Sequence, residues 1–282
     1  MFSIIIPTFN NLKYLENCLN SIKKHSKIRN QVIIHINDGF DGTLDLIKKL
    51  KIDFTYSKKN LGLCTSINLA AKKALYDYIL YSHDDMYFCP GWDEYLIKEI
   101  KNINHNSFYF SGTMIESNSG HIKLNCGTSI ENFNEKKLLR DFNKSKYYDH
   151  QGSHFAPHVV HKDLWNRVGG FSEEFNPGIC SDPDFNMKLW NEKVRIFKGI
   201  SKFRVYHFSS ITTRKKTGFK QNKGDITFLK KWGFTSKFFK KHFMKSKSKY
   251  RKPLEDPNQN FSFFFDLLIC KIKLIYLLIL NK

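Results

Sequence analysis

Residues 2–10 read FSIIIPTFN, an apolar run from Phe2 to Pro7 that is followed by the polar residues Thr8 and Asn10. A short apolar run of this kind, bounded by turn-forming residues, predicts a β-strand that is buried on both faces. Strands buried on both faces belong to parallel sheets that helices cover on each side. The opening stretch therefore favours an α/β fold.

The same pattern returns three times along the chain. Further strands are predicted at Gln31–Asn37, Ile52–Ser57 and Tyr78–Ser82, and apolar residues at helical spacing lie between the strands. These helical stripes are Leu12, Leu15, Leu19 and Ile22; Leu44, Ile47 and Leu50; and Ile67, Ala70, Ala71, Ala74 and Leu75. The alternation predicts a Rossmann-like, mostly parallel central sheet flanked by helices.

Polar residues follow each of the four predicted strands. They are Thr8 and Asn10; Asn37, Asp38 and Gly39; Lys58, Lys59 and Asn60; and His83, Asp84 and Asp85. In open α/β sheets, ligands bind outside the carboxyl ends of the strands. The four strand ends therefore predict one crevice for a polar ligand.

The acidic pair Asp84-Asp85 directly follows the apolar run YILYS. Carboxylates at a strand end suit Mg²⁺ or Mn²⁺, and a cation there would neutralise charge that develops on a departing phosphate. The alternative is an ordinary turn or helix cap before Pro90-Gly91, where aspartate is common without a ligand. Asp38 has the same two interpretations, because it could accept a hydrogen bond from a nucleoside or simply form an Asp-Gly turn.

The loop Asn60-Leu61-Gly62 leads into a predicted helix, whose free N–H groups could bind an anion or serve only as a capped helix start. Asp182 precedes Pro183, and Asp at the N-cap with Pro at the first helical position is ordinary helix-start chemistry. A carboxylate held in this way is also preorganised to act as a general base. The local sequence leaves these alternatives open.

His207 follows the strand-like stretch Phe203–Tyr206. Its imidazole could bind a metal or could simply be a hydrogen-bonded histidine. Arg214 and Lys215 come soon after and could hold a diphosphate. Between these blocks the pattern weakens: Ser107–Thr113 is a candidate strand, and the Lys/Asp-rich segment up to Asp149 is predicted to be a mobile loop.

Six motifs together resemble the family 2 glycosyltransferases of the GT-A fold. They are SIIIPTFNN, INDGFDGT, NLGLCTSIN, HDD before PGW, VGGFSEEF leading to SDPDF, and HFSS, in this order between residue 2 and about residue 213. The resemblance implies inverting transfer of a sugar from a UDP-, GDP- or TDP-sugar to a hydroxyl of a glycan or glycolipid. It also implies a GT-A domain over residues 1–215, with a nucleotide-binding half (1–106) and an acceptor and catalytic half (107–215).

The resemblance further implies roles for individual residues. The residues expected to bind the nucleotide are Pro7, Thr8, Asn10, Asp38, Lys59, Asn60 and Asp84. Asp85 and His207 are expected to bind Mn²⁺ or Mg²⁺, and Asp182 is expected to act as the general base. Arg214 and Lys215 are expected to bind the diphosphate. Three positions depart from the family pattern. His83 replaces the first acid of the DxD-like triplet, Asn37 an acid of the second strand end, and Ser181 the Glu of a Glu-Asp pair.

The C-terminal tail, residues 216–282, is basic and then apolar. The formal charge of the chain is +20, and seventeen Lys or Arg against one acid lie between Gly199 and Pro253. The last 22 residues, FSFFFDLLICKIKLIYLLILNK, are apolar but interrupted by charges. This order predicts an interfacial helix on an anionic membrane surface. The alternatives are a solvated basic face and a helix that packs on the domain or on a second copy of the chain.

Composition bears on where the chain is expected to lie in the cell and on its alternative functions. The six cysteines show no metal-binding spacing, and no signal peptide precedes the first strand, so the chain is predicted to be cytoplasmic or peripheral on the cytoplasmic face of a membrane. The basic segment lacks a nucleic-acid recognition motif, and we expect no nucleic acid partner. Two alternatives stay open: transfer to a polyprenyl phosphate, which needs no base, and a non-catalytic relative that binds nucleotide sugar.

Overall fold

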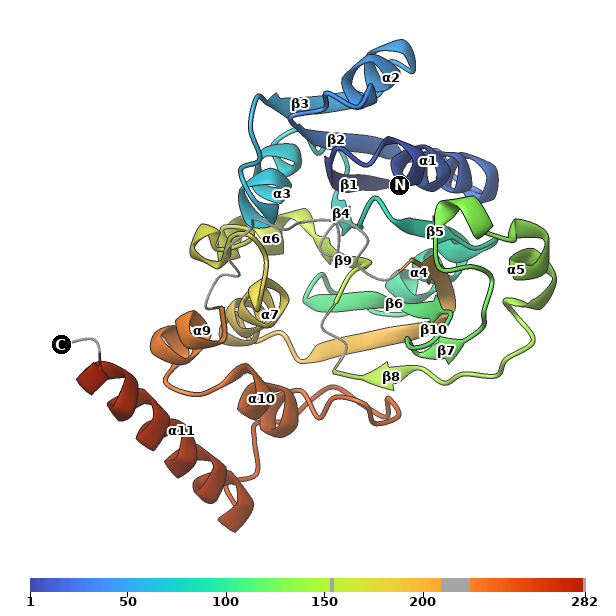
Figure 1. Ribbon diagram of the computed structural model, residues 1–282. Helices are drawn as coiled ribbons and strands as arrows, with labels where there is room; N and C mark the ends of the chain where they lie inside the picture. Colours follow the sequence, from blue (N-terminus) through green and yellow to red (C-terminus); the bar gives the residue numbers. More distant parts are fainter. Residues whose placement is uncertain (153–154, 209–223, 281–282) are drawn as a thin grey trace.

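One β-sheet runs through the computed structural model, which describes residues 1–152, 155–208 and 224–280 (Figure 1). In the described chain its strands lie in the order β3-β2-β1-β4-β9-β6-β10-β5, with β7 beside β6 and β8 beside β10. The strands are β1 (Phe2–Phe9), β2 (Gln31–Asn37), β3 (Asp53–Ser57), β4 (Tyr78–Tyr81), β5 (Met86–Phe88), β6 (Phe108–Glu116), β7 (Ile122–Lys123), β8 (His150–Gln151), β9 (His158–His161) and β10 (Ile196–His207). The predicted mostly parallel sheet is confirmed.

The first four strands are parallel and neighbouring. Phe9 pairs with Asn37, Asn37 with Ser57, and Ile5 with Tyr81, so β1 to β4 end at the same edge of the sheet. The antiparallel strand β9 then joins β4 to β6. Strand β10 runs parallel to β6 and antiparallel to β5. His207, the last residue of β10, therefore lies opposite Met86 of β5.

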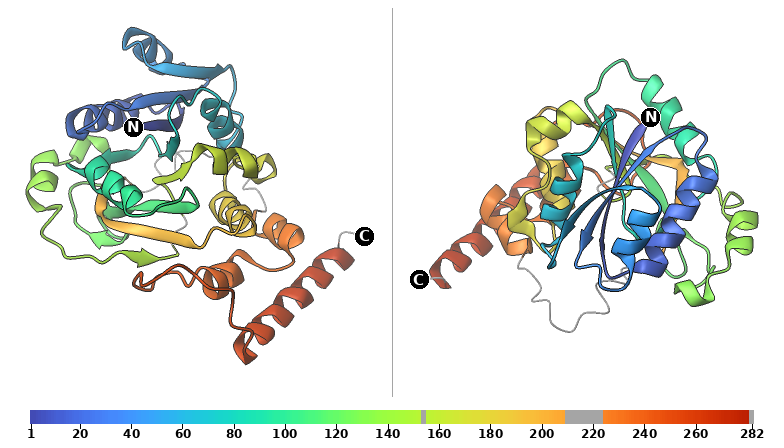
Figure 2. Two further views of the ribbon diagram at one scale, coloured as in Figure 1. Left: turned by 180° about the vertical axis from the view of Figure 1, so that it is seen from behind. Right: turned by 90° about the horizontal axis from the view of Figure 1, so that it is seen from above.

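Helices cover both faces of the sheet (Figure 2). One face carries α1 (Leu12–His25), α2 (Thr43–Lys49) and α4 (Trp92–Lys101), and the other carries α3 (Leu63–Ala71), α6 (Lys162–Val168) and α7 (Ser181–Asn191). On the first face, Asp93 at the start of α4 accepts hydrogen bonds from the backbone of Lys27 and Ile28 just after α1. Leu15 and Ile22 of the first predicted stripe are buried. Leu50 and Leu75, which end the other two predicted stripes, are exposed because they lie beyond the ends of α2 and α3.

Two local expectations are wrong. The segment predicted to be a loop up to Asp149 contains the helix α5 (Glu135–Asp141), whose Leu138 is buried beside Tyr206. Its weak amphipathic pattern hid it, because only one side chain of this short helix is fully buried. The helix near Asp182 begins at Ser181 after Cys180, so Asp182 lies in the first turn and is not the N-cap.

The tail consists of α9 (Gly224–Trp232), α10 (Ser236–Phe238), a π-helical turn η3 (Phe239–Phe243) and α11 (Phe261–Leu280). Its first part joins the main hydrophobic core through Phe228, Phe239, Met244 and Leu254. Asp184 of α7, fully buried, accepts hydrogen bonds from Trp232 and Lys231 of α9. Within the described chain, no helix is both long and apolar enough to span a lipid bilayer.

Candidate active site

The candidate site lies at the edge where the first four strands end. The ends of β1 and β2 are joined by side chains: Asn10 Nδ2 donates to Asp38 Oδ2 (3.1 Å), and the Gly39 backbone N–H donates to Asn10 Oδ1 (2.9 Å). Gly39 has φ +76°, and a β-carbon there would lie 2.7 Å from Ile36, so the turn after β2 needs glycine. Asn10 and Asp38 therefore lie side by side, as the predicted crevice requires.

Asn37 organises the end of β3, a function that the sequence did not indicate. Its Oδ1 accepts the Leu61 backbone N–H (2.9 Å), and its Nδ2 donates to Ser66 Oγ of α3 (2.9 Å). A carboxylate at this position could not donate to Ser66. The amide therefore fixes the loop that carries Lys59, which is exposed, and Asn60, whose Oδ1 caps the Gly62 N–H (2.9 Å).

Thr8 and Asp84 form the buried floor of the site beside Pro7, which is also buried. Thr8 Oγ1 donates to Asp84 Oδ2 at 2.7 Å and joins the end of β1 to the turn after β4. Burial, together with the neighbouring Asp85 carboxylate, raises the pKa of Asp84 to about 7. In this structure the two side chains bind each other, and their contact with a nucleotide stays a prediction.

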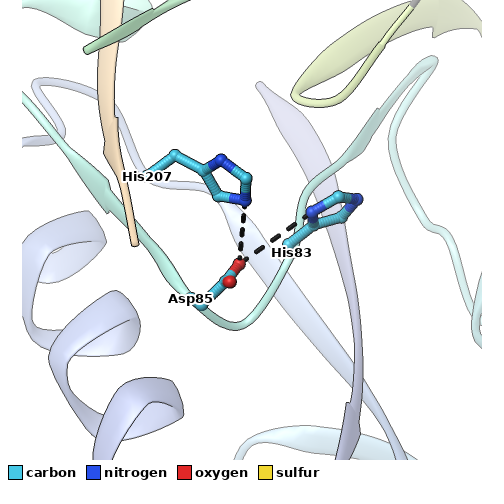
Figure 3. Close-up of side chains that lie close together, drawn as sticks. All are labelled: His83, Asp85 and His207. Atoms are coloured by element: carbon cyan, nitrogen blue, oxygen red, sulfur yellow. Dashed lines mark ion pairs between the residues drawn. The ribbon is translucent and has the colours of Figure 1, made fainter. Parts of the chain in front are cut away.

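Three side chains converge next to this floor (Figure 3). His207 Nε2 lies 3.4 Å from Asp85 Oδ1, and His83 Nδ1 lies 3.9 Å from the same oxygen. One ligand atom from each residue lies within 4.8 Å of the others, which is a spacing that a single cation can bridge. The sequence pointed to Asp85 and His207 but counted His83 only as a departure from the family pattern.

Glu116 orients His207 and was missed from the sequence. Its Oε1 lies 2.6 Å from His207 Nδ1, and both side chains are buried. A carboxylate behind a histidine fixes the tautomer and raises the basicity of the other nitrogen. Glu116 ends β6, far from His207 in sequence, and no local signal marks it.

The cluster is electrostatically suited to a positive charge. Burial alone would lower the pKa of His207, but Asp85 and Glu116 outweigh burial and raise it to about 10. His207 Nε2 is buried and has no hydrogen-bond partner within the described ranges, and it lies 3.4 Å from Asp85 Oδ1. A divalent cation between these groups would satisfy both, so the residues present fit a metal ion.

Asp182 lies at the start of α7, and its environment favours the neutral carboxyl. Its Oδ1 is buried and finds no hydrogen-bond partner in the described part of the chain, and burial raises its pKa to about 7. Asn186 Nδ2 donates a hydrogen bond to the backbone oxygen of Asp182 (2.8 Å), not to the Asp182 carboxyl. An ionisable group poised near neutrality is typical of a catalytic acid or base.

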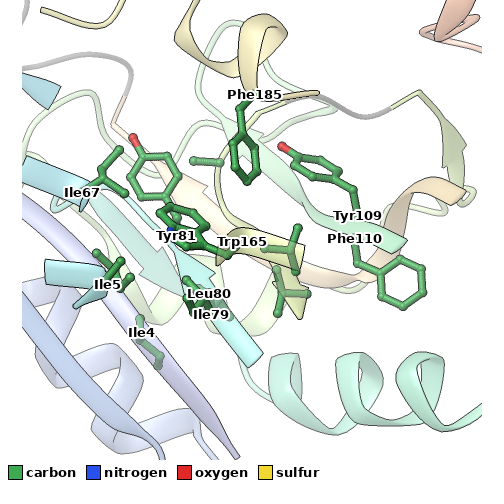
Figure 4. Packing of buried hydrophobic residues seen from close by; sticks show 14 of the residues in the cluster. Ile4, Ile5, Ile67, Ile79, Leu80, Tyr81, Tyr109, Phe110, Trp165 and Phe185 are labelled. Carbon is green, nitrogen blue, oxygen red and sulfur yellow. The ribbon is translucent and has the colours of Figure 1, made fainter. Parts of the chain in front are cut away.

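Tyr81 links the two groups, and sequence analysis did not select it. Its buried hydroxyl also has no hydrogen-bond partner among the residues described. Burial raises its pKa well above the usual value, and the charges of Asp182 and Asp85 raise it further. Figure 4 shows Tyr81 near Trp165, with Phe185 of α7 between Tyr81 and Tyr109. The charges of Asp182 and of Asp85 therefore both reach the Tyr81 hydroxyl.

His158 completes this buried layer. It pairs with Tyr81 across β9 and β4, and the two rings lie 5.2 Å apart between centroids. Burial lowers its pKa to about 3, so it is neutral, and neither ring nitrogen has a hydrogen-bond partner in the chain as described. Arg214 and Lys215, the predicted diphosphate contacts, lie outside the described residues.

Comparison with known protein families gives a match to the model described as glycosyl transferase family 2 over residues 3–165. Two curated relatives from Pasteurella multocida are each 25% identical to the chain: a chondroitin synthase (strain Pm70) over 231 residues and a hyaluronan synthase over 244 residues. The matches cover 78% and 84% of this chain but only 22% of each relative. The chain thus spans about a fifth of the length of these relatives.

Solved structures share the fold. S. aureus TarS 1-349 in complex with UDP-GlcNAc superposes with a TM-score of 0.55 at 15% identity, covering 85% of this chain and 74% of that one. GalNAc-T7 with UDP, GalNAc and Mn²⁺ superposes with a TM-score of 0.57 at 14% identity, covering 73% of this chain and 43% of that one. At these identities the similarity concerns the fold alone.

Proposed function

Since the chain belongs to glycosyl transferase family 2, we propose that it transfers a sugar with inversion from a nucleotide-diphosphate sugar to a hydroxyl acceptor, with the help of a divalent cation. The predictions of this family, of a glycosyltransferase and of an α/β GT-A fold are confirmed. The reaction mechanism, the cation, the donor and the acceptor are the proposal.

One observation carries the proposal. His83, Asp85 and His207 converge as potential ligands of one cation, and the buried Asp182 carboxyl lies close enough to Tyr81 for its charge, like that of Asp85, to raise the pKa of the Tyr81 hydroxyl. Inverting transfer needs both kinds of environment in one active site, because charge accumulates on the leaving diphosphate while the acceptor must lose a proton.

The donor is proposed to be a UDP-sugar. Two solved structures of the same fold contain UDP-GlcNAc or UDP, which supports testing uridine before guanosine or thymidine donors. Asn10 and Asp38 lie side by side at the ends of β1 and β2, where the nucleoside is expected. Thr8, Asp84, Lys59 and Asn60 are its other proposed contacts, with Pro7 beneath.

The cation is proposed to be Mn²⁺ in preference to Mg²⁺. Mg²⁺ favours oxygen ligands, whereas the cluster offers two imidazole nitrogens and one carboxylate. The crystal structure of GalNAc-T7 contains Mn²⁺. When bound, the cation would neutralise negative charge on the leaving diphosphate. His83, Asp85 and His207 would hold it, and Glu116 would keep His207 in the binding tautomer.

Asp182 is the proposed general base. It would take the proton of the acceptor hydroxyl as the acceptor oxygen bonds to the anomeric carbon and the bond from that carbon to the diphosphate breaks. The products are the glycosylated acceptor and the nucleoside diphosphate. A pKa of about 7 suits this step, because the carboxylate is available near neutrality and is still basic enough to accept a proton.

A ligand panel tests the proposal directly. UDP-, GDP- and TDP-sugars are added to the full chain with Mn²⁺, with Mg²⁺ or with a chelator, and the thermal midpoint and release of nucleoside diphosphate are measured. We expect stabilisation by a UDP-sugar with Mn²⁺, worth about 2.7 kcal/mol at a hundred times Kd, and slow metal-dependent hydrolysis. If stabilisation and hydrolysis were the same with chelator as with Mn²⁺, the proposed role of the cation would be wrong. If no nucleotide sugar changed the thermal midpoint or was hydrolysed, the proposed transfer reaction would be wrong.

A further inference from the structure

Helix α11 docks on the domain by one face only. Phe263, Leu267, Cys270, Leu274 and Leu277 pack against Leu229 of α9 and Phe238 of α10. Asp266 on the same side accepts hydrogen bonds from Lys241 Nζ (2.6 Å) and His242 Nε2 (2.7 Å). The helix therefore sits in a defined orientation along the rim of the molecule, where Figures 1 and 2 show it.

The opposite face of α11 is apolar and exposed. Its large side chains are Phe261, Phe264, Phe265, Leu268, Ile269, Ile272, Ile275, Tyr276, Leu278 and Ile279. Leu268, Ile272 and Ile275 are each 57% exposed. A helix at the surface of a soluble domain normally places polar residues there, and a contiguous apolar patch of this kind marks a surface that binds a partner.

Two lysines border this outward face. With about 3.6 residues per turn, Lys271 and Lys273 fall on opposite flanks of the helix, between the docked side and the outward side. Both are exposed, and the Lys271 ammonium lies beside the turn at Gly233. Lysines at the margins of an apolar face can extend their charges to phosphate groups while their stems stay on apolar surface.

The positive charges around α11 favour one kind of partner for its apolar face. Lys230 and Lys237 are exposed on the elements that hold the helix, whereas Lys241 is paired with Asp266. A second copy docked by two-fold symmetry would bring these like charges together, which opposes association. A helix pair would also need only a narrow apolar seam, whereas this face is about half the circumference of the helix. Anionic lipid headgroups attract the same charges.

We propose that the outward face of α11 binds an anionic lipid surface, with the helix lying in the plane of the headgroups and the lysines at its margins on lipid phosphates. Over its described residues, the helix is not long and apolar enough to span the bilayer. Its apolar outward face and the basic residues around it are typical of a helix that lies at the membrane interface. The cytoplasmic leaflet of a membrane is the surface of this chemistry. This inference goes beyond the proposed transfer reaction and does not depend on it.

Vesicle flotation of the full chain tests it. Vesicles of phosphatidylcholine alone are compared with vesicles that contain phosphatidylserine, at low and high salt. We expect binding to the anionic vesicles that weakens with salt, and much weaker binding to neutral vesicles. The double variant Leu268→Gln/Ile275→Gln should lower the affinity about a hundredfold. Lys271→Gln/Lys273→Gln should lower it about thirtyfold on anionic vesicles only.

The controls separate this inference from folding and from catalysis. Leu50→Gln/Leu75→Gln replaces two exposed leucines elsewhere on the surface and should leave vesicle binding unchanged. All four proteins should keep the same thermal midpoint and the same donor hydrolysis, because none of the changed side chains is in the core or at the candidate site. The inference is overturned if Leu268→Gln/Ile275→Gln binds vesicles like the unchanged protein, or if the unchanged protein ignores vesicles and forms a dimer that this variant abolishes.

Discussion

The two halves of the candidate site differ in how their polar groups are partnered. Around His207, Asp85 and Glu116 supply acidic partners that raise its pKa to about 10. Around Asp182, burial acts alone and raises the pKa of the carboxyl to about 7, and neither its Oδ1 nor the Tyr81 hydroxyl has a partner among the described residues. In the proposed mechanism, the first half would hold a positive charge and the second would accept a proton from a group that arrives with the substrate.

The strongest test of this contrast removes the isolated carboxyl. Asp182→Asn should lower kcat about a thousandfold with little change in donor binding, because the base is needed only when the acceptor loses its proton. Steady-state kinetics with a hydroxyl acceptor measures the effect. Asp163→Asn, which changes an exposed aspartate of α6, is the matched control and should be neutral. Full activity of Asp182→Asn would favour transfer to an acceptor that is already an anion, such as a polyprenyl phosphate.

The next test removes the central ligand of the other half. Asp85→Asn should weaken Mn²⁺ binding about a hundredfold, since the only carboxylate among the three clustered ligands becomes an amide. Calorimetric titration of Mn²⁺ into the nucleotide-bound protein measures it. Excess Mn²⁺ should restore much of the activity, which it cannot do for Asp182→Asn. Unchanged Mn²⁺ affinity would mean that the cation, if used, binds elsewhere.

A smaller effect is expected from the residue behind His207. Glu116→Gln keeps the size of the side chain and should weaken Mn²⁺ binding about tenfold, because the amide fixes the imidazole less well and no longer raises its basicity. Glu131→Gln, which changes an exposed glutamate, should have no effect. If Glu116→Gln lowered thermal stability but left the Mn²⁺ titration unchanged, Glu116 would be structural only.

The pH profile should show a change of the same modest size, about tenfold between pH 6 and pH 8 in kcat/KM. The Asp182 carboxyl must be ionised to act as a base and titrates near 7, so activity should rise with pH across this window and then level off. Stability should move in the opposite direction. Because folding raises the pKa of Asp182, its contribution to the free energy of unfolding is fully present below about pH 4 and is lost as the pH rises through about 7.

This opposition provides an internal check. Asp182→Asn removes the titrating group, so the thermal midpoint of the variant should exceed that of the unchanged protein at pH 8 and match it more closely at pH 4. An activity profile that is flat from pH 6 to pH 8 in the unchanged protein, measured with a saturating donor and Mn²⁺, would argue against Asp182 as the base.

Local sequence was sufficient for the frame of the site. Apolar runs such as Phe2–Pro7 identify their strands because burial on both faces leaves no polar alternation, and parallel strands necessarily end at one edge. Asp38 and Asp85 could be selected because each follows such a run directly. The position of His83 in the cluster was not predicted, because a histidine in place of an acid suggests the loss of a metal ligand. In the structure, His83 Nδ1 lies 3.9 Å from Asp85 Oδ1.

The limits of local pattern appear at β6 and β10. Glu116 and His207 meet because these two strands run in parallel. The charge of Asp182 reaches Tyr81 because Phe185 of α7 stacks on His158 of β9, the strand beside β4. Tyr81 looks like one more core aromatic in the run YILYS. Its unpartnered hydroxyl is visible only when the surrounding side chains are in place.

The sequence by itself determined the α/β class, the edge of the sheet that forms the site, and the family to which the chain belongs. Those features follow from hydrophobic periodicity and short motifs, which are properties of neighbouring residues. The tertiary structure alone decided which imidazoles lie near the same oxygen of Asp85, which carboxyl has no partner among the described residues, and which face of α11 is left exposed. Burial and electrostatic environment arise from residues distant in sequence, so no local pattern can contain them.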